Sequence, residues 1–304
     1  MALRGESFSQ AGACAVGRIA ALAATLLAVS LQAHAIECDP GDYESPVPGH
    51  DLALIYMQHA TRSKQYVNGS QALDNAKLSS DVTLLRYTHP MQLDMGVFNP
   101  QFVLPIARTD ATDNLSALGS SSGVGDLMLV FPVWLVGDRV ARRHFAAGPY
   151  VFVPIGSYDK NKPSNIGENR WKMAFQAGGV TGIGKSDFTL DVVFDVTYFG
   201  KNDKLGPTEK TLRQDPLSQL QGALSYHISS ATRVALSLYR TWGGETRVDG
   251  VAQSDRVKTD KFLLTASTFV DPQNQLLISW GRDISVENGL KENSRVNFRY
   301  LHVY

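Results

Sequence analysis

Apolar and polar side chains alternate along much of the chain, and residues 187–199 (DFTLDVVFDVTYF) show the pattern most clearly. One parity of this segment is apolar and comprises Phe188, Leu190, Val192, Phe194, Val196 and Tyr198. The other parity carries Asp187, Thr189, Asp191, Asp195 and Thr197. Because successive side chains of an extended chain point to opposite faces, the segment predicts a β-strand with one apolar and one acidic wall.

Twelve extended stretches follow one another from about residue 50 to the C-terminus, separated by turn signals or polar loops. They cover residues 51–61, 79–89, 93–107, 123–136, 144–155, 169–182, 187–199, 213–228, 232–242, 258–270, 275–286 and 294–304. The fold class is therefore all-β. A soluble β-sandwich also alternates, so alternation alone does not separate it from a barrel. Twelve is an even number, as single-chain bacterial barrels require.

The connections between these stretches differ in length at the two ends of the predicted sheet. Those after the even-numbered stretches are tight, as at 184–186 and 271–274, whereas most of the others are longer, as at 109–122, 156–168 and 243–256. Outer-membrane barrels have short periplasmic turns and longer extracellular loops. A sheet in a bilayer must also close, because its edges find no water there. We therefore predict a closed antiparallel transmembrane β-barrel in contact with membrane lipid.

The two ends of the chain carry export signals. Arg4 and Arg18 accompany an apolar run over residues 19–31, and the small residues Ala33 and Ala35 follow it, which predicts a signal peptide cleaved after Ala35. The run is shorter than the roughly 20 residues of a spanning helix. The last stretch ends on the aromatic Tyr304, which resembles the signal read by the outer-membrane assembly machinery. We expect localisation in the cell outer membrane.

Three regions are thus expected: a signal peptide at 1–35, a flexible segment at 36–49 and the barrel at 50–304. The middle region is rich in Pro, Gly and acidic residues and has no period. It is either a disordered periplasmic leader or a plug that folds back into the lumen. Cys38 is the single cysteine left after the leader, so an internal disulfide is excluded, and its role stays open.

Composition narrows the function. Beyond the leader no stretch approaches 18 apolar residues, and the mean hydropathy of −0.13 excludes helical membrane spans. Removing Arg4, Arg18 and Glu6 with the leader leaves 27 basic against 28 acidic residues, without long runs of one sign, so nucleic acid is not an expected partner.

Charged residues on the polar parity are candidates for lining a lumen or its constriction: Arg170, Lys172, Asp187, Asp191, Asp195, Arg295 and Arg299. The sixth and seventh stretches are adjacent and antiparallel, so their opposite charges should face one another across a ladder. Two interpretations stay open: a constriction that selects solutes, or a lattice of salt bridges that fills a narrow barrel.

Catalytic chemistry has little support in the sequence. Asp191 and Asp195 would lie roughly 13 Å apart on one strand, too far for a cooperating acid/base pair. Ser225 and His227 share one face and would serve an alternative, a barrel hydrolase. No spacing of His, Cys or Asp resembles a metal site, and the Gly178–Gly184 run does not match a phosphate loop. We expect no catalytic site, no metal and no cofactor.

Three segments resemble the outer-membrane MetA-pathway phenol-degradation (transporter-like) family: GVGDL at 123–127, GPYVFVPIGSYD at 148–159 and NIGENRW at 165–171. The likeness extends from about residue 50 to the C-terminus. It implies a bacterial outer-membrane protein associated with aromatic-compound catabolism, and it provides no catalytic residues to carry over. Our hypothesis is passive uptake of small hydrophobic or aromatic solutes. The alternatives are the hydrolase and a structural or adhesive surface barrel.

Overall fold

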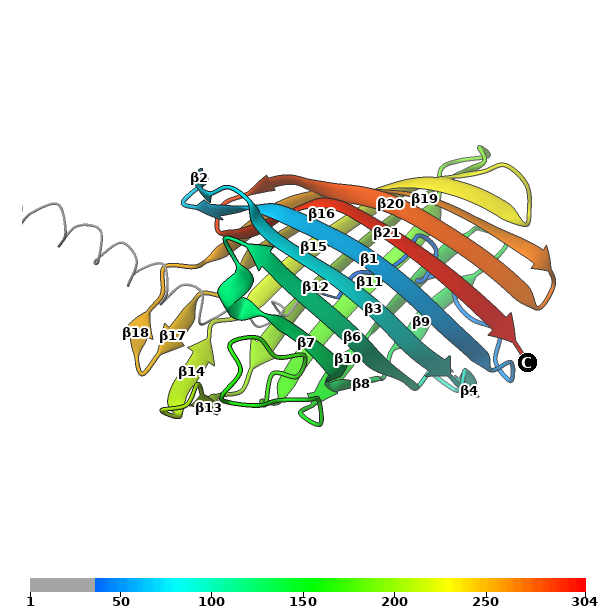
Figure 1. The fold of residues 1–304 in the computed structure, drawn as a ribbon. Helices are drawn as coiled ribbons and strands as arrows, with labels where there is room; N and C mark the ends of the chain where they lie inside the picture. The colour runs from blue at the N-terminus through cyan, green and yellow to red at the C-terminus, as the bar shows by residue number, and fades with distance from the viewer. Residues whose placement is uncertain (1–35) are drawn as a thin grey trace, which may run out of the picture.

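The computed structural model describes residues 36–304, which form a closed antiparallel barrel of twelve strands (Figure 1). Eleven of the twelve positions are single strands: β1 (Leu52–Val67), β3 (Ala76–Thr88), β6 (Gln101–Asp113), β10 (Arg143–Val153), β11 (Lys172–Gly182), β12 (Phe188–Phe199), β15 (Leu217–His227), β16 (Thr232–Gly243), β19 (Val257–Asp271), β20 (Asn274–Val286) and β21 (Gly289–Val303). Within residues 36–304 no helix is long and apolar enough to span a bilayer. The predicted fold class is confirmed.

The barrel closes between its first and last strands. β1 pairs antiparallel with β21 from Leu52 opposite Val303 to Tyr66 opposite Gly289, while its other edge pairs with β3. The backbone N–H of Tyr304 continues the ladder by donating to Asp51 O at 2.9 Å. Each barrel strand therefore has two hydrogen-bonded neighbours, and the unpaired backbone groups that a bilayer could not satisfy are removed.

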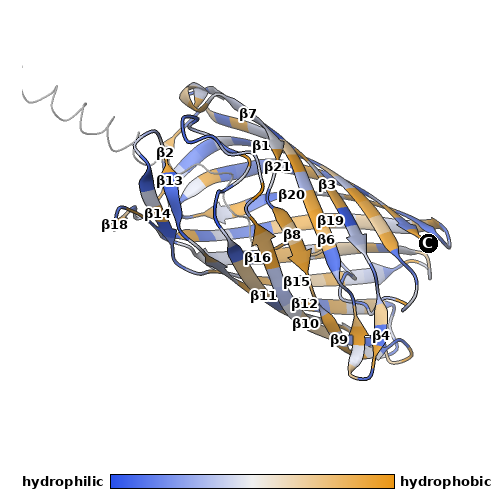
Figure 2. Ribbon diagram, turned by 90° about the horizontal axis from the view of Figure 1, so that it is seen from below, coloured by the Kyte–Doolittle hydropathy of each residue, from blue (hydrophilic) through white to orange (hydrophobic). Residues whose placement is uncertain are grey.

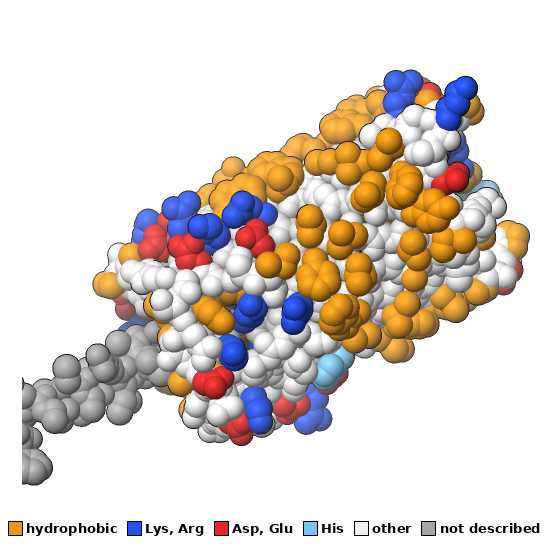
Figure 3. Space-filling model, turned by 90° about the horizontal axis from the view of Figure 1, so that it is seen from above, with side chains coloured by type: hydrophobic (Ala, Val, Ile, Leu, Met, Phe, Trp, Pro, Cys, Tyr) orange, Lys and Arg blue, Asp and Glu red, His pale blue; other side chains and the backbone are white. Residues whose placement is uncertain are grey.

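The apolar faces of the strands point outward and the polar faces inward. In β12, Leu190, Val192 and Phe194 are exposed, whereas Asp191 and Asp195 are buried inside. Orange hydrophobic residues alternate with polar ones along the strands in Figure 2, and hydrophobic side chains cover the outer surface in Figure 3. This arrangement is the reverse of a soluble protein and suits contact with acyl chains.

The fourth position of the barrel is interrupted, although the sequence pattern predicted one strand over 123–136. Its wall consists of β7 (Ser120–Val124), β8 (Leu127–Val130) and β9 (Val133–Asp138). The second break falls at Phe131 and Pro132, where proline has no N–H to donate to the ladder. The backbone at this break lies very close to β10. A Cβ atom on Gly148 of β10 would lie only 2.3 Å from the carbonyl oxygen of Phe131, so the position requires glycine.

The third predicted stretch, 93–107, also differs from the structure. A small hairpin of β4 (Met91–Leu93) and β5 (Gly96–Phe98) occupies its start, and the barrel strand begins only at Gln101. Pro100 precedes that strand, and β5 pairs with β9 instead of continuing into β6. The prediction of one strand over 93–107 was therefore wrong, because this range contains part of the β4–β5 hairpin and the start of β6.

Long connections gather at one end of the barrel, opposite the end that holds the C-terminus (Figure 1). Two of these loops form a second sheet of β13 (Asn202–Leu205), β14 (Lys210–Gln214), β17 (Thr246–Val248) and β18 (Val251–Ala252). A short strand β2 (Ser70–Leu73) and a 3₁₀ turn at Ser116–Leu118 lie in two others. The connection between β20 and β21 is an exception, because it is only residues 287–288.

The outward orientation of β12 makes a prediction about depth in the bilayer. Val192→Arg, near the middle of the strand, should destabilise the folded barrel by about 2–4 kcal/mol, whereas Tyr198→Arg, near its end, should cost about 0–1 kcal/mol. Denaturant titration of the protein folded in lipid vesicles measures both values. Equal costs at the two positions would contradict the assignment of the apolar face to the acyl chains.

Candidate functional site

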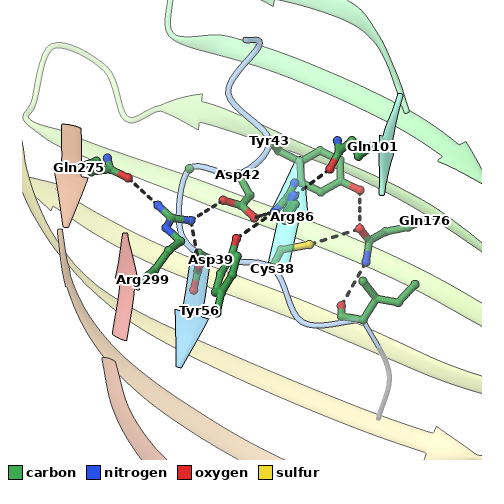
Figure 4. Close-up of polar contacts among 12 residues, drawn as sticks. Cys38, Asp39, Asp42, Tyr43, Tyr56, Arg86, Gln101, Gln176, Gln275 and Arg299 are labelled. Carbon is green, nitrogen blue, oxygen red and sulfur yellow. Dashed lines mark hydrogen bonds and ion pairs between the residues drawn. The ribbon is translucent and has the colours of Figure 1, made fainter. Parts of the chain in front are cut away.

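The segment before the first strand lies inside the barrel. His50 sits beside the C-terminus, with Nδ1 3.2 Å from Tyr304 O, and the chain turns from there into the lumen. Tyr43 is buried, and the carbonyl oxygen of Ile36 accepts a hydrogen bond from Gln221 Nε2 at 2.6 Å near the middle of β15. We call residues 36–46 the lumen segment. Figure 4 shows it against the inner side of the barrel strands, with Arg86, Arg299 and Gln176 pointing toward it.

Two arginines of the barrel wall hold the carboxylates of the lumen segment. Arg299 of β21 contacts Asp39 at 2.8 Å and Asp42 at 3.0 Å, and Arg86 of β3 contacts Asp42 at 3.1 Å (Figure 4). The neutral side chain of Tyr56 also contacts Arg86, because its hydroxyl oxygen accepts a hydrogen bond from Arg86 Nη1 at 3.1 Å. Asp42 therefore bridges strands that lie on either side of β1.

The electrostatics of these two aspartates differ. Burial alone would raise the pKa of Asp42, but Arg86 and Arg299 together outweigh burial and lower it. For Asp39 burial dominates, and the single contact with Arg299 only partly offsets it, so the pKa of Asp39 is raised to about 6. Asp42 is thus the better compensated anion of the pair and the stronger attachment point.

A second charged cluster holds the start of the lumen segment. Glu37 accepts from Lys261 of β19 at 2.8 Å and from Arg295 of β21 at 2.7 Å. Burial opposes ionisation of Glu37, yet Arg295 and Lys261 outweigh it and lower its pKa. Glu292 lies behind this cluster, 2.8 Å from both Arg295 and Arg62. Opposite charges therefore alternate across this part of the lumen.

The side-chain oxygen of one glutamine in β11 accepts three hydrogen bonds. Gln176 Oε1 accepts from the Cys38 thiol at 3.2 Å, Tyr43 Oη at 2.9 Å and Tyr150 Oη at 2.7 Å. Burial raises the pKa of the Cys38 thiol, which keeps it protonated and able to donate. Cys38 thus takes part in positioning the lumen segment, a role that its isolation in the sequence did not indicate.

The base of the lumen segment is anchored by packing as well as charge. The Tyr43 and Trp134 rings lie 6.3 Å apart, and Trp134 Nε1 donates to Tyr43 O at 2.8 Å. Glu44 pairs with Arg233 at 2.6 Å, and Ser45 N donates to His144 Nδ1 at 3.2 Å. These contacts lie at the end of the barrel where β1 begins and the chain terminates.

A cavity of ≈ 360 Å³ remains between the lumen segment and one side of the barrel. One wall is apolar and comes mainly from β3, β6, β8 and β10: Val82, Leu84, Val103, Pro105, Met128, Val130 and Phe152. The rest of the lining is polar and carries Arg62, Arg86, Arg295 and Tyr56, together with acids of the lumen segment. The lining extends from Trp134 in β9 to Ile166 in the loop after β10. The space is therefore amphipathic and elongated.

The candidate residues chosen from the sequence are divided among different places. Arg295 and Arg299 are buried in the lumen and hold the lumen segment. Asp191 and Asp195 are also buried there, and Asp191 accepts from Gly41 N at 2.7 Å. Asp187 is different, because it is exposed in the turn between β11 and β12.

The expected ladder of opposite charges between the sixth and seventh strands does not form. The antiparallel register sets Lys172 opposite Phe199, Gln176 opposite Asp195 and Val180 opposite Asp191. Arg170 and Lys172 instead bind Glu168, with Arg170 at 2.6 Å, and these two cations lower the pKa of Glu168 to about 2 against the effect of burial. The prediction failed because the start of β11 lies opposite the end of β12, so that Asp195 and Asp191 face positions four and eight residues beyond Lys172.

Sequence reasoning missed the partners that complete the site. Arg62 and Glu292 lie just outside the predicted stretches 51–61 and 294–304, whereas Arg86 and Lys261 lie inside two of the stretches. The lumen segment itself carried a signal, since Glu37, Asp39, Asp42 and Glu44 are four acids within a short stretch. Such a run needs either water or an equal number of cations.

The pair considered for a hydrolase has no catalytic geometry in the described part of the chain. Ser225 Oγ is buried without a hydrogen-bond partner. His227 Nε2 instead lies 3.1 Å from Thr189 Oγ1 on the neighbouring strand. A nucleophile and its base need to be within hydrogen-bonding distance, so this arrangement does not activate the serine.

Similar proteins agree with this architecture. The model of the family described as "Putative MetA-pathway of phenol degradation" matches residues 61–300. The crystal structure of the COG4313 outer membrane channel from Pseudomonas putida F1 shares 39% sequence identity and a TM-score of 0.85, covering 88% of this chain and 100% of that one. No curated protein matches the chain significantly.

Two more distant structures share the fold alone. The transport unit of the autotransporter AIDA-I from Escherichia coli has 8% identity and a TM-score of 0.52, with 93% of this chain and 96% of that chain covered. The TodX monoaromatic hydrocarbon channel has 10% identity and a TM-score of 0.50, with 87% and 92% covered. Because the family model matches most of the chain and a solved outer-membrane channel is 39% identical over its whole length, this chain belongs to the MetA-pathway phenol-degradation family of outer-membrane β-barrels.

Proposed function

We propose that the protein is an outer-membrane channel for passive uptake of small hydrophobic or aromatic compounds, linked to their catabolism, and that the lumen segment is its plug. The observation that carries this proposal is the amphipathic cavity between the lumen segment and the apolar wall of β3, β6, β8 and β10. The solved relative is an outer membrane channel, which supports transport as the general function.

The size and lining of the cavity favour a small aromatic solute. An apolar cavity of about 150 Å³ already binds benzene. The cavity here is ≈ 360 Å³, so a single ring with substituents fits. Val103 and Val130 offer an apolar surface for the ring, while Arg86 and Tyr56 in the same lining can donate hydrogen bonds to a hydroxyl or carboxylate. A purely polar solute would leave the apolar wall without compensation.

The way the plug is held supports its displacement. Ion pairs removed from water gain Coulomb energy but lose hydration, so their net contribution to binding is small compared with the number of contacts. The lumen segment relies mainly on such pairs, at Glu37, Asp39, Asp42 and Glu44. Its apolar anchoring comes from Tyr43 and Cys38, which pack in one small cluster with Trp134, Ala146, Val180 and Val193. The segment can therefore leave without unfolding the barrel.

The same proposal includes the route to the membrane. Residues 1–35 act as a signal peptide removed after Ala35, and the strand that ends at Tyr304 is presented to the assembly machinery. The structure of residues 1–35 lies outside the described part of the chain. Support comes from the apolar run at 19–31 and from the exposed aromatic end of the chain, where Tyr304 is 65% exposed.

Deleting residues 36–48 should open the lumen, because it removes the lumen segment together with its four acids, which pair with cations of the strands. Uptake of serine into swelling liposomes should rise well above that of the intact protein. A shift in gel mobility between unheated and boiled samples checks that the shortened barrel is folded. Equal uptake by the two folded proteins would contradict the plug.

Asp42→Asn should loosen the lumen segment without shortening it. The amide oxygen of the new asparagine can still accept a hydrogen bond, but the negative charge shared by Arg86 and Arg299 is lost. Breaking a buried ion pair typically costs about 3–5 kcal/mol. Liposome uptake should then lie between the intact and deleted proteins. Asp203→Asn is the matched control, because its pair with Lys201 is exposed outside the barrel. The same increase in both variants would refute the assignment.

The apolar wall should set preference for aromatic solutes. Val103→Thr and Val130→Thr keep the volume but place a hydroxyl in the wall. Together they should lower the uptake of phenylalanine relative to serine, two solutes that cross lipid slowly and differ in the ring. The expected change in this ratio is about tenfold, since a small apolar contact is worth about 1–3 kcal/mol. An unchanged ratio of phenylalanine to serine uptake would contradict a role of the cavity wall in selecting solutes.

A further inference from the structure

Two carboxylates on the lumenal face of β12 lack a cation. Asp191 and Asp195 are 5% and 0% exposed, and neither takes part in a salt bridge with any residue of 36–304. Each also has one oxygen, Oδ1, without a hydrogen-bond partner among these residues. A buried carboxylate without a countercharge is costly, so such an oxygen indicates a missing positive partner.

The start of the lumen segment lies directly at one of them. Gln176 Nε2 donates both to Asp195 Oδ2 at 3.4 Å and to the carbonyl oxygen of Ile36 at 3.2 Å, so the Asp195 carboxylate and the Ile36 backbone meet at one amide. Ile36 and Gln221 are the other polar neighbours of this carboxylate. The carbonyl oxygen of Ile36 is held in turn by Gln176, Gln219 and Gln221 at 3.2, 3.2 and 2.6 Å. Three neutral amides and one anion therefore enclose the backbone of a single residue.

This residue is the one that cleavage after Ala35 would expose. We propose that removal of the leader turns the nitrogen of Ile36 into an α-ammonium that is the countercharge of Asp195, so that the mature N-terminus is itself the ligand of a lumenal pocket. The inference rests on cleavage after Ala35 as part of the proposed function. It explains why a carboxylate enclosed by neutral glutamines can be kept in the barrel wall.

The chemistry of the cleavage creates the new charge. A peptidase of the export pathway hydrolyses the Ala35–Ile36 bond, so that the hydroxyl of water joins the Ala35 carbonyl and a hydrogen joins the Ile36 nitrogen. An α-amino group has a typical pKa of about 7.7–8.0, so it takes up a further proton at neutral pH. A single neutral N–H donor becomes three charged donors, and the oxygen Asp195 Oδ1 gains a partner.

The contact with Asp195 therefore forms only when cleavage occurs directly before Ile36. A chain that began one residue earlier or later would shift its ammonium by one residue, about 3.3 Å in an extended chain, and would lose the contact with Asp195. Asp191 does not substitute for it, since its other oxygen is occupied by Gly41 N at 2.7 Å further along the lumen segment.

The test uses the protein exported with its own leader and purified in detergent. Intact mass first identifies the terminal residue, which should be Ile36. An aldehyde reagent selective for terminal amines, 2-pyridinecarboxaldehyde, then reports how free the amine is. Labelling of the folded wild type should be about ten- to a hundredfold slower than that of Asp195→Asn, the range expected for one hydrogen bond to a charged group.

Asp191→Asn is the matched control, because it removes a neighbouring buried charge but can still accept from Gly41 N. It should label as slowly as the wild type. A chain with one glycine inserted before Ile36 should label quickly, and it keeps the test decisive if Asp195→Asn does not fold. Another terminal residue, or equal rates for wild type and Asp195→Asn, would overturn the ion pair. Because the readout is labelling, these outcomes are independent of whether solutes pass.

Discussion

A barrel of this size encloses a lumen in which strand side chains carry charge but bulk water has little room, so the charges have to be neutralised by the protein. The strands contribute Arg86, Arg295, Arg299 and Lys261 to this interior, and the lumen segment contributes the facing carboxylates. Neither set could stay shielded from water alone, because a buried ion without a partner costs several kcal/mol. The mutual neutralisation explains why a stretch without periodicity or apolar content is nevertheless ordered inside the barrel.

The fold was predictable because two independent requirements act on every strand. Lipid requires an apolar outer face, and the backbone requires closure, so alternation such as that of Leu190, Asp191 and Val192 occurs throughout the chain. The predictions were wrong where a local backbone event breaks a strand without breaking the alternation. Pro132 ends β8, and Pro100 separates the β4–β5 hairpin from β6, yet both proline residues lie within or beside apolar runs.

The site was less predictable because it depends on register and on long-range pairing. Alternation correctly assigned Arg295 and Arg299 to the inner face, but it could not say that their partners are Glu37, Asp39 and Asp42, more than 250 residues earlier in the chain. It also placed Arg170 and Lys172 beside the acids of β12, although the antiparallel register sets Asp195 and Asp191 four and eight positions away from Lys172. Composition was informative in one respect: the acids of 37–44 need cations, and the inner faces of the strands supply them.

The energetics of an ion-paired plug differ from those of a hydrophobic one. Removing one side chain of a buried ion pair leaves the other charge buried without a partner or water, and this causes the large loss of stability when such pairs are broken. When the entire lumen segment leaves, water enters the space it occupied, and Arg86 and Arg299 become hydrated instead of stranded. The cost of displacement is therefore smaller than the sum of the individual contacts. An apolar plug would gain no hydration from the entering water, so the charge of the lumen segment agrees with the proposal that it is a displaceable plug.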